Sequence, residues 1–128
     1  MKKEKFVMEF VLNSCSHSVL WTAISTPSGL SDWFADDVRL KGDKWLFVWD
    51  GVEQEAVRLS CRDKQLVKFR WSSDEIGCFF ELKINEDALT GNVTLVVTDF
   101  AELSEIDDVK LLWEEQVRAL GLQLGVRL

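Results

Sequence analysis

Tyrosine is absent from this sequence, and proline and histidine each occur once. The three cysteines, Cys15, Cys61 and Cys78, are odd in number and widely spaced, and they form no CxxC pair. Such spacing argues against a disulfide framework and against a clustered zinc site. We therefore expect free thiols in a reducing cytoplasm, with no metal and no cofactor.

Long apolar runs are also lacking. No stretch of about 18 apolar residues occurs, so no transmembrane helix is expected. The amino terminus has no signal-peptide core, because Glu9 interrupts the apolar segment 6–12. Internal repeats, low-complexity tracts and linker-like stretches are missing too, and we expect one domain over residues 1–128.

Positive charge is scarce relative to negative charge. The chain has 15 Lys and Arg against 22 Asp and Glu, for a formal net charge of −7. Phosphate backbones and anionic lipid surfaces repel such a surface, so neither nucleic acid nor membrane is expected as a partner. The short basic start at Lys2, Lys3 and Lys5 is interpreted as the soluble edge of a first strand.

Apolar and aromatic residues are abundant. Hydrophobic residues make up 47% of the chain and charged residues 29%, a mixture typical of globular proteins. Six Trp and eight Phe are present, and each large ring can bury on the order of 150–250 Å². This aromatic content predicts either a dense core or a lined cavity.

A strand and two short helices are predicted in the first third of the chain. Residues 5–12 alternate between apolar side chains and Glu9, which is typical of a strand. A serine in segment 14–16 can cap the helix that follows. Pro27 ends this helix and suits the first position of a second one. The expected buried face of the strand carries Phe6, Met8, Phe10 and Leu12. That of the first helix carries Val19, Leu20, Ala23 and Ile24, and that of the second helix carries Leu30, Trp33 and Phe34.

Strands dominate the middle of the chain. Short segments of β-prone residues alternate with turn signals such as Lys41-Gly42-Asp43 and Asp50-Gly51. Meanders of this kind are antiparallel, with one face buried. The predicted strands are 38–40, 44–49, 53–61, 66–71, 78–84 and 93–98.

The last segment predicts a long helix. Ser104 and Asp107 have the spacing of a capping box, and helical spacing continues for about 20 residues. The expected apolar face carries Ile106, Val109, Trp113, Val117, Leu120 and Leu124. The fold class is therefore α+β: a curved antiparallel sheet of about six to seven strands around a long carboxy-terminal helix, with two short helices after the first strand.

This order of elements resembles the helix-grip fold of the START-like (SRPBCC) superfamily, and within it the branch named after the activator of Hsp90 ATPase. The segment Leu20–Phe34 resembles that branch's opening signature of a helix, a proline-containing break and an aromatic pair. The segment Trp113–Leu124 resembles its Trp-and-Leu pattern in the closing helix. The resemblance implies a space between sheet and helix that often holds an apolar molecule.

Two departures from the branch concern its chaperone role. Arg62-Asp63-Lys64 replaces a proline-containing turn in the middle of the sheet. The chain also ends at Leu128, without room for the extra domain of the eukaryotic Hsp90 activators, so a small bacterial standalone type is expected.

Polar residues give few candidates for catalysis. His17 lies only two residues from Cys15, and residues two apart on a helix do not face each other. Asp32, Asp36 and Asp37 lie near aromatic residues in the sequence, and a carboxyl beside an aromatic ring could have a raised pKa. We interpret all of these as surface residues, and no catalytic residue is predicted. Glu53, Glu55 and Glu81 are expected to form cross-strand pairs on the solvent face with Arg58, Lys68, Arg70 and Lys83.

The aromatic set is the most informative feature. Rings that alternate along one strand point to one side of the sheet, as at Trp45, Phe47 and Trp49. Such rings make either a filled core or an apolar pocket opposite the closing helix. The expected ligand-binding residues are Trp33, Phe34, Trp45, Phe47, Trp49, Phe69, Trp71, Phe80, Trp113 and Val117.

Three functions are compatible with these features. The first is a non-enzymatic domain that binds a small hydrophobic molecule between the sheet and the closing helix. The second is a protein-interaction or chaperone-associated module, or a homodimer formed through the outer apolar residues Leu46 and Val48. The third, a cyclase or hydrolase, requires a buried acid that faces the pocket, and the sequence alone identifies none.

Overall fold

The structure is a computed structural model that describes residues 2–126. Its elements are β1 (Lys3–Leu12), α1 (His17–Ser25), α2 (Pro27–Ser31), β2 (Asp37–Lys41), β3 (Lys44–Trp49), β4 (Val52–Arg62), β5 (Leu66–Trp71), β6 (Phe80–Glu86), β7 (Val93–Glu102), a 3₁₀ turn (Leu103–Glu105) and α3 (Ile106–Leu124). The predicted order of a strand, two short helices, further strands and a long helix is confirmed.

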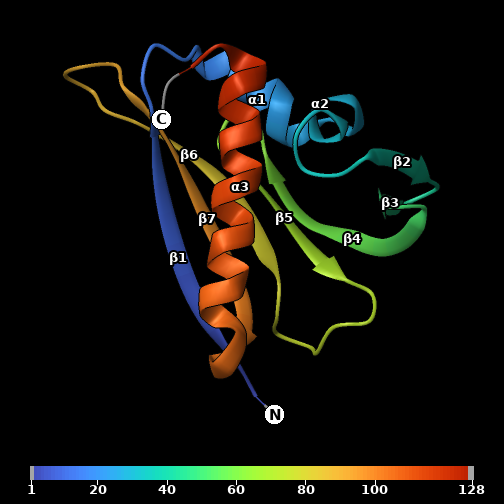
Figure 1. The fold of residues 1–128 in the computed structure, drawn as a ribbon. Coiled ribbons are helices and arrows are strands. Elements are labelled where there is room, and N and C mark those ends of the chain that lie inside the picture. Colours follow the sequence, from blue (N-terminus) through green and yellow to red (C-terminus); the bar gives the residue numbers. More distant parts are fainter. Residues whose placement is uncertain (1, 127–128) are drawn as a thin grey trace.

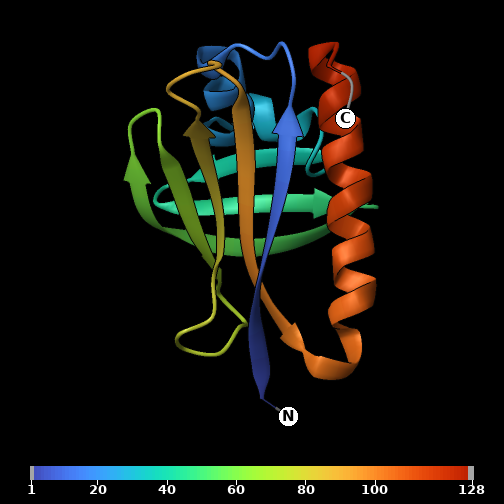
Figure 2. The same cartoon turned by 90° about the vertical axis from the view of Figure 1, so that its left-hand side faces the viewer.

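The seven strands form one sheet in the order β1-β7-β6-β5-β4-β3-β2, and every pairing is antiparallel. The sheet is strongly curved, and α3 runs along its concave side (Figure 1). Figure 2 shows β2, β3 and β4 running across the direction of β1, β6 and β7. The pairing of β4 with β5 has a register shift between Arg58 and Ser60, typical of a β-bulge, which increases local twist.

The core lies between the concave face of the sheet and α3. The predicted alternation is confirmed in β5 and β7, where Val67, Phe69, Val93, Leu95 and Val97 are all buried. From α3, the buried residues include Trp113, Val117 and Leu120, which recur at helical spacing. One face of each strand and one stripe of the helix therefore supply the interior.

Two turns match their sequence signals in detail. Gly42 has a φ of 63°, in the left-handed region that glycine adopts without a Cβ penalty. Asp50 and Gly51 have φ values of 49° and 77°, and two successive positive values are the mark of a type I′ hairpin. This turn fixes the register of β3 against β4, with Trp49 opposite Val52.

The two short helices meet at a close backbone contact. Thr26 caps α2, because the backbone N–H of Gly29 donates to its Oγ1 over 2.9 Å, and Pro27 occupies the first turn as predicted. A Cβ on Gly29 would clash with the carbonyl oxygen of Thr22 and would lie 2.8 Å from the Cα of Ala23. Glycine at this position therefore lets α2 pack directly on α1.

Two details of the predicted helices are wrong. Val19 is 49% exposed, since α1 buries only the narrower stripe of Leu20, Ala23 and Ile24. The capping box at Ser104 does not form, because Ser104 lies within a 3₁₀ turn and α3 begins at Ile106 without a side-chain cap.

Other differences concern where elements end. Trp33 and Phe34 are buried as expected, but they follow α2 rather than lie on it. The strand predicted at 93–98 continues to Glu102, and the one predicted at 78–84 runs from Phe80 to Glu86. Within residues 2–126, no helix is long and apolar enough to cross a membrane.

Candidate ligand-binding pocket

The aromatic residues of β3 form a ladder on the concave side of the sheet. The rings of Trp45 and Phe47 stack with centroids 6.3 Å apart, and those of Phe47 and Trp49 with centroids 6.2 Å apart. This confirms that the three rings point to one side. Phe69 of β5 and Phe80 of β6 extend the aromatic surface beyond β4, with their centroids 5.2 Å apart.

Beside this ladder, a pocket of about 380 Å³ lies between the sheet and α3. Its volume falls within the range of about 300–1,000 Å³ that is typical of small-molecule sites. The residues that line it are Phe34, Trp49, Gln54, Trp71, Phe80, Asp99, Val109, Leu112, Trp113 and Gln116.

Five of the ten residues expected to bind a ligand therefore line the pocket: Phe34, Trp49, Trp71, Phe80 and Trp113. The other five, Trp33, Trp45, Phe47, Phe69 and Val117, lie in the packed interior. The ten expected residues therefore divide into five pocket walls and five residues of the packed core. A role in ligand binding stays a prediction for all ten, of which the first five line this pocket and the other five are buried in the core.

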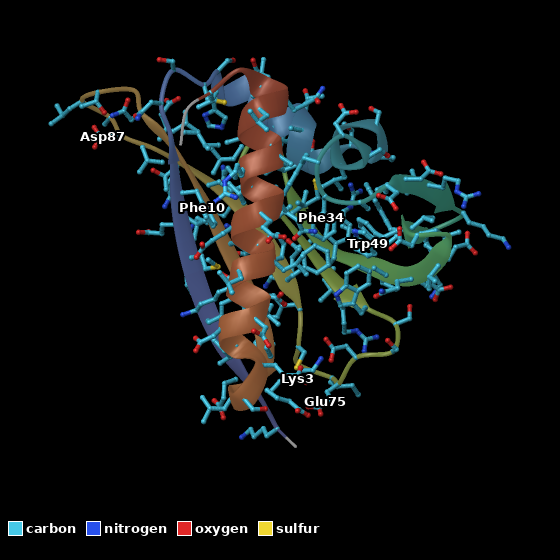
Figure 3. All side chains as sticks on the ribbon, in the orientation of Figure 1. Lys3, Phe10, Phe34, Trp49, Glu75 and Asp87 are labelled. Atoms are coloured by element: carbon cyan, nitrogen blue, oxygen red, sulfur yellow. The ribbon has the colours of Figure 1, made fainter. Side chains whose placement is uncertain are left out.

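Phe34 is the central wall of the pocket. Its ring stacks on Trp113 of α3 and on Phe80 of β6, with centroid distances of 5.4 Å in both cases. Its backbone carbonyl accepts hydrogen bonds from Trp49 Nε1 over 3.0 Å and from Gln116 Nε2 over 2.9 Å. Figure 3 shows Phe34 and Trp49 in the space between α3 and the bent part of the sheet. These bonds fix the walls relative to one another.

The pocket is open to solvent on one side. Trp49 and Trp71 are half-buried, whereas Phe34, Phe80 and Trp113 are buried. The closed end is therefore aromatic, and the rim carries two indole rings.

Five lining residues were not among the expected set: Gln54, Asp99, Val109, Leu112 and Gln116. Asp99 is the charged one. Asp99 lies on β7, half-buried, and lines the pocket beside the indole of Trp113. Its Oδ2 accepts a hydrogen bond from Trp113 Nε1 over 2.8 Å, and its Oδ1 accepts one from the backbone N–H of Phe100 over 2.8 Å. The predicted strand ended one residue earlier. Extension of the alternation of Leu95 and Val97 by one step would have pointed Asp99 inward.

Burial raises the pKa of Asp99 above its usual range. The hydrogen bonds from Trp113 and Phe100 act in the opposite direction, and so does the charge of Lys3, but burial outweighs them. The negative charge of Asp74 raises the pKa further. The carboxyl of Asp99 therefore binds a proton more tightly than an ordinary aspartate does.

An ion pair lies near this carboxyl. Lys3 Nζ donates to Asp74 Oδ1 over 2.7 Å, and the Asp74 side chain is only 9% exposed. This hydrogen bond is the main reason why the pKa of Lys3 is raised. Burial raises the pKa of the nearby Cys78 thiol, so its neutral form is favoured. The pair joins the start of β1 to the loop between β5 and β6.

The other polar candidates have structural roles away from the pocket. His17 Nε2 donates to the carbonyl of Lys64 over 2.6 Å, and its Nδ1 lies 3.3 Å from Glu86 Oε1. This half-buried histidine ties α1 to β6 and to the turn before β5. Asp36 Oδ2 accepts from the backbone N–H of Asp50 over 2.8 Å and so supports the β3–β4 turn. Over residues 2–126, no group of three or more His, Cys, Asp or Glu side chains is placed to hold a metal ion.

Cross-strand charge pairs occur on the outer face, as expected for Glu53, Glu55 and Glu81. Lys68 lies 3.8 Å from Glu81, which is one of the predicted combinations. Glu55 instead pairs with Lys44 at 3.5 Å, and Glu53 pairs with Arg39 at 3.1 Å. Such exposed pairs contribute about 0–1 kcal/mol each.

A curved antiparallel sheet around one long helix, with a lined space between them, defines the helix-grip class of proteins. The family model described as a START-like superfamily domain matches residues 1–126. The chain therefore belongs to the START-like superfamily, as the sequence resemblance implied.

Solved structures agree with this family. BfR322 from Bacteroides fragilis is 40% identical, with 100% of this chain and 95% of that one covered and a TM-score of 0.70. The Aha1 dimer from Colwellia psychrerythraea is 13% identical, with 94% and 96% covered and a TM-score of 0.77. CalU16 from Micromonospora echinospora is 16% identical, with 95% and 85% covered and a TM-score of 0.67. The last two likenesses concern the fold alone. No curated protein matches the sequence closely enough to count as a relative.

Proposed function

We propose that this START-like domain binds a small hydrophobic molecule in the pocket between the sheet and α3. The observation that carries the proposal is a space of about 380 Å³ with five aromatic walls and an open rim. Water against such walls is released when an apolar molecule enters, which favours binding. The walls are held in place by hydrogen bonds to the Phe34 carbonyl, so the site is formed before the ligand arrives.

Enzymatic activity has weaker support than binding. Asp99 meets the condition of an acid that faces the pocket, and its raised pKa is of the kind seen in catalytic acids. Acid–base catalysis commonly uses a second titratable group. The other described residues around the pocket are aromatic, aliphatic or amide side chains. A single carboxyl among such residues is better suited to orienting a ligand than to catalysing a reaction on it.

A protein-interaction role is the second candidate, and one observation favours it. The outer face of α3 exposes two leucines, with Leu111 at 57% and Leu122 at 80%. The self-association surface expected at Leu46 and Val48 is less open than expected, since Val48 is buried and Leu46 is half-buried. Sedimentation velocity over a 100-fold range of concentration tests for a homodimer. A sedimentation coefficient that stays at the monomer value throughout would exclude a homodimer in that range.

Ligand binding is tested with two tryptophan variants. Titration of neutral aromatic and aliphatic molecules, followed by intrinsic fluorescence and calorimetry, should give saturable binding to the unmodified protein. Trp71→Ala removes one of the two indole rings at the rim of the pocket and should weaken binding at least about 10-fold. Trp21→Ala is the matched control, because Trp21 is a half-buried indole on α1 that does not line the pocket. Equal losses in both variants, or no saturable binding by any molecule, would contradict the proposal.

A further inference from the structure

The polar groups of the pocket are few and unequal. Of the described residues that line it, Asp99 is the one charged side chain, and it is an anion. Gln54 and Gln116 are neutral amides, and the Nε2 of Gln116 is already bonded to the Phe34 carbonyl. Any charge preference of the pocket therefore depends on Asp99.

The carboxylate of Asp99 has acceptor capacity to spare. Its two oxygens offer about four lone-pair sites. The N–H groups of Trp113 and Phe100 each occupy one site, on different oxygens. Lys3 is the cation whose charge acts on Asp99, but its ammonium is hydrogen-bonded to Asp74 over 2.7 Å. The pocket thus presents a carboxylate with two free acceptor sites and no cation among its lining residues.

The aromatic walls of the pocket also favour a cation. The face of an indole or benzene ring carries negative potential and attracts ammonium groups within about 6 Å. The pocket places three indoles and two phenyl rings around the same space as the carboxylate. The net charge of −7 favours the approach of a cation over that of an anion.

We propose that the ligand is a small organic cation: a protonated amine on a flat apolar body, with its ammonium hydrogen-bonded to Asp99 and its body between the aromatic walls. This inference rests on the proposed function, because it specifies the ligand class of the same pocket. The ammonium supplies the hydrogen-bond donors that the free acceptor sites of Asp99 lack. A carboxylate ligand of the same shape is repelled by the negative charge of Asp99.

Three probes with one shared body test this charge preference. 2-Naphthylmethylamine, 2-naphthylmethanol and 2-naphthoic acid differ mainly in charge, which is positive, neutral and negative at pH 7.5. Their binding is measured by calorimetry and by the ¹H–¹⁵N signal of the Trp113 indole, whose N–H donates to Asp99. The amine should bind roughly 10- to 100-fold more tightly than the alcohol, the gain expected of a charge-assisted hydrogen bond. The acid should bind more weakly than the alcohol.

Two variants locate the source of the preference. Asp99→Asn should reduce the ratio of amine to alcohol affinity to about 1. Asp108→Asn makes the same change in net charge at an exposed position in the first turn of α3 and should leave the ratio as it is. An equal fall in both variants would assign the effect to net charge and overturn the proposal.

The pH dependence gives a readout that needs no variant. The groups around Asp99 are Lys3 of β1, Asp74 and Cys78 of the β5–β6 loop, and Trp113 of α3, and protonation of Asp99 removes the charge that holds the amine. Amine binding should weaken as the pH falls through the raised pKa of Asp99, whereas alcohol binding should change little.

The possible failures are distinguishable. Alcohol binding as tight as amine binding would overturn the cation inference and leave an apolar pocket in place. Absence of binding by all three probes up to millimolar concentration would overturn the cation inference, and the proposed function falls with it when the other aromatic and aliphatic molecules also fail to bind.

Discussion

Replacement of Phe47 by alanine tests the division of the rings into a packed core and pocket walls. Phe47 is fully buried and does not line the pocket. Its ring lies 5.2–6.3 Å, centroid to centroid, from the rings of Phe34, Trp45, Trp49, Phe69, Trp71 and Phe80. Phe→Ala substitutions in cores cost about 3–5 kcal/mol, and edge-to-face pairs add about 0.5–1.5 kcal/mol beyond burial. We expect Phe47→Ala to lose about 4–5 kcal/mol.

A loss of this size is large for the domain. Proteins of this length have unfolding free energies of about 5–15 kcal/mol, so the loss removes roughly a third of the stability at the upper end of this range and nearly all of it at the lower end. With about 3–5 °C of melting temperature per kcal/mol, the melting point should fall by roughly 12–25 °C. Phe47→Leu retains part of the side chain and should lose about 2 kcal/mol.

Urea denaturation followed by far-ultraviolet circular dichroism measures these losses, with a check that the m-value is unchanged. Leu122→Ala serves as the control, because that leucine is 80% exposed and its removal should change stability by no more than about 0.5 kcal/mol. A loss below about 1 kcal/mol for Phe47→Ala would refute the reasoning. It would mean that the ring borders open space and that the pocket extends into the supposed core.

Three further predictions concern single positions. Gly29→Ala should lose about 1–3 kcal/mol in urea denaturation, because the new methyl group meets the backbone of α1. Lys3→Met should destabilise the protein at neutral pH by about 1–3 kcal/mol, because it leaves the nearly buried Asp74 carboxylate without its ammonium. The raised pKa of Asp99 means that the folded state holds this proton more tightly than the unfolded state does. The stability of the unmodified protein relative to Asp99→Asn should therefore fall as the pH rises from about 4 to the folded pKa, and stay level above it.

Each of these predictions has a matched control. Ser28→Ala changes an exposed neighbour of Gly29, and Lys5→Met changes an exposed lysine of β1, so both should be nearly neutral. Equal losses in the variant and its control would contradict the steric argument for Gly29 or the ion-pair argument for Lys3. A stability difference between the unmodified protein and Asp99→Asn that rises with pH would contradict the sign derived for Asp99.

Much of the fold could be predicted because its signals are local. The strand predicted at 66–71 has the bounds Leu66–Trp71 in the structure, since apolar and charged side chains alternate from Val67 to Trp71. The Asp50-Gly51 hairpin was predicted from two residues that tolerate positive φ. The capping box failed because its spacing is also compatible with a 3₁₀ turn before the helix, as at Ser104.

The pocket was harder to predict because alternation identifies the face of a strand and not the depth of a side chain. Phe47 and Trp49 lie two residues apart on the same face, yet the first is in the core and the second is at the rim. The difference depends on where α3 and Phe34 lie, and these contacts join distant parts of the chain. Asp99 was missed for a related reason: an acid near the end of a strand resembles the start of a loop until the partner strand β1 is known to extend alongside it.

The pairing of β1 with β7 has a consequence for biosynthesis. Lys3 lies opposite Glu102, so the first strand finds its neighbour only after roughly 100 further residues have been translated. At about 5–20 residues per second, the nascent chain exposes the apolar side of β1, with Phe6 and Leu12, for several seconds. Closure of such a long loop is also slow in refolding. A chaperone that shields the first dozen residues would therefore raise the yield of native protein more than one that acts on the finished chain.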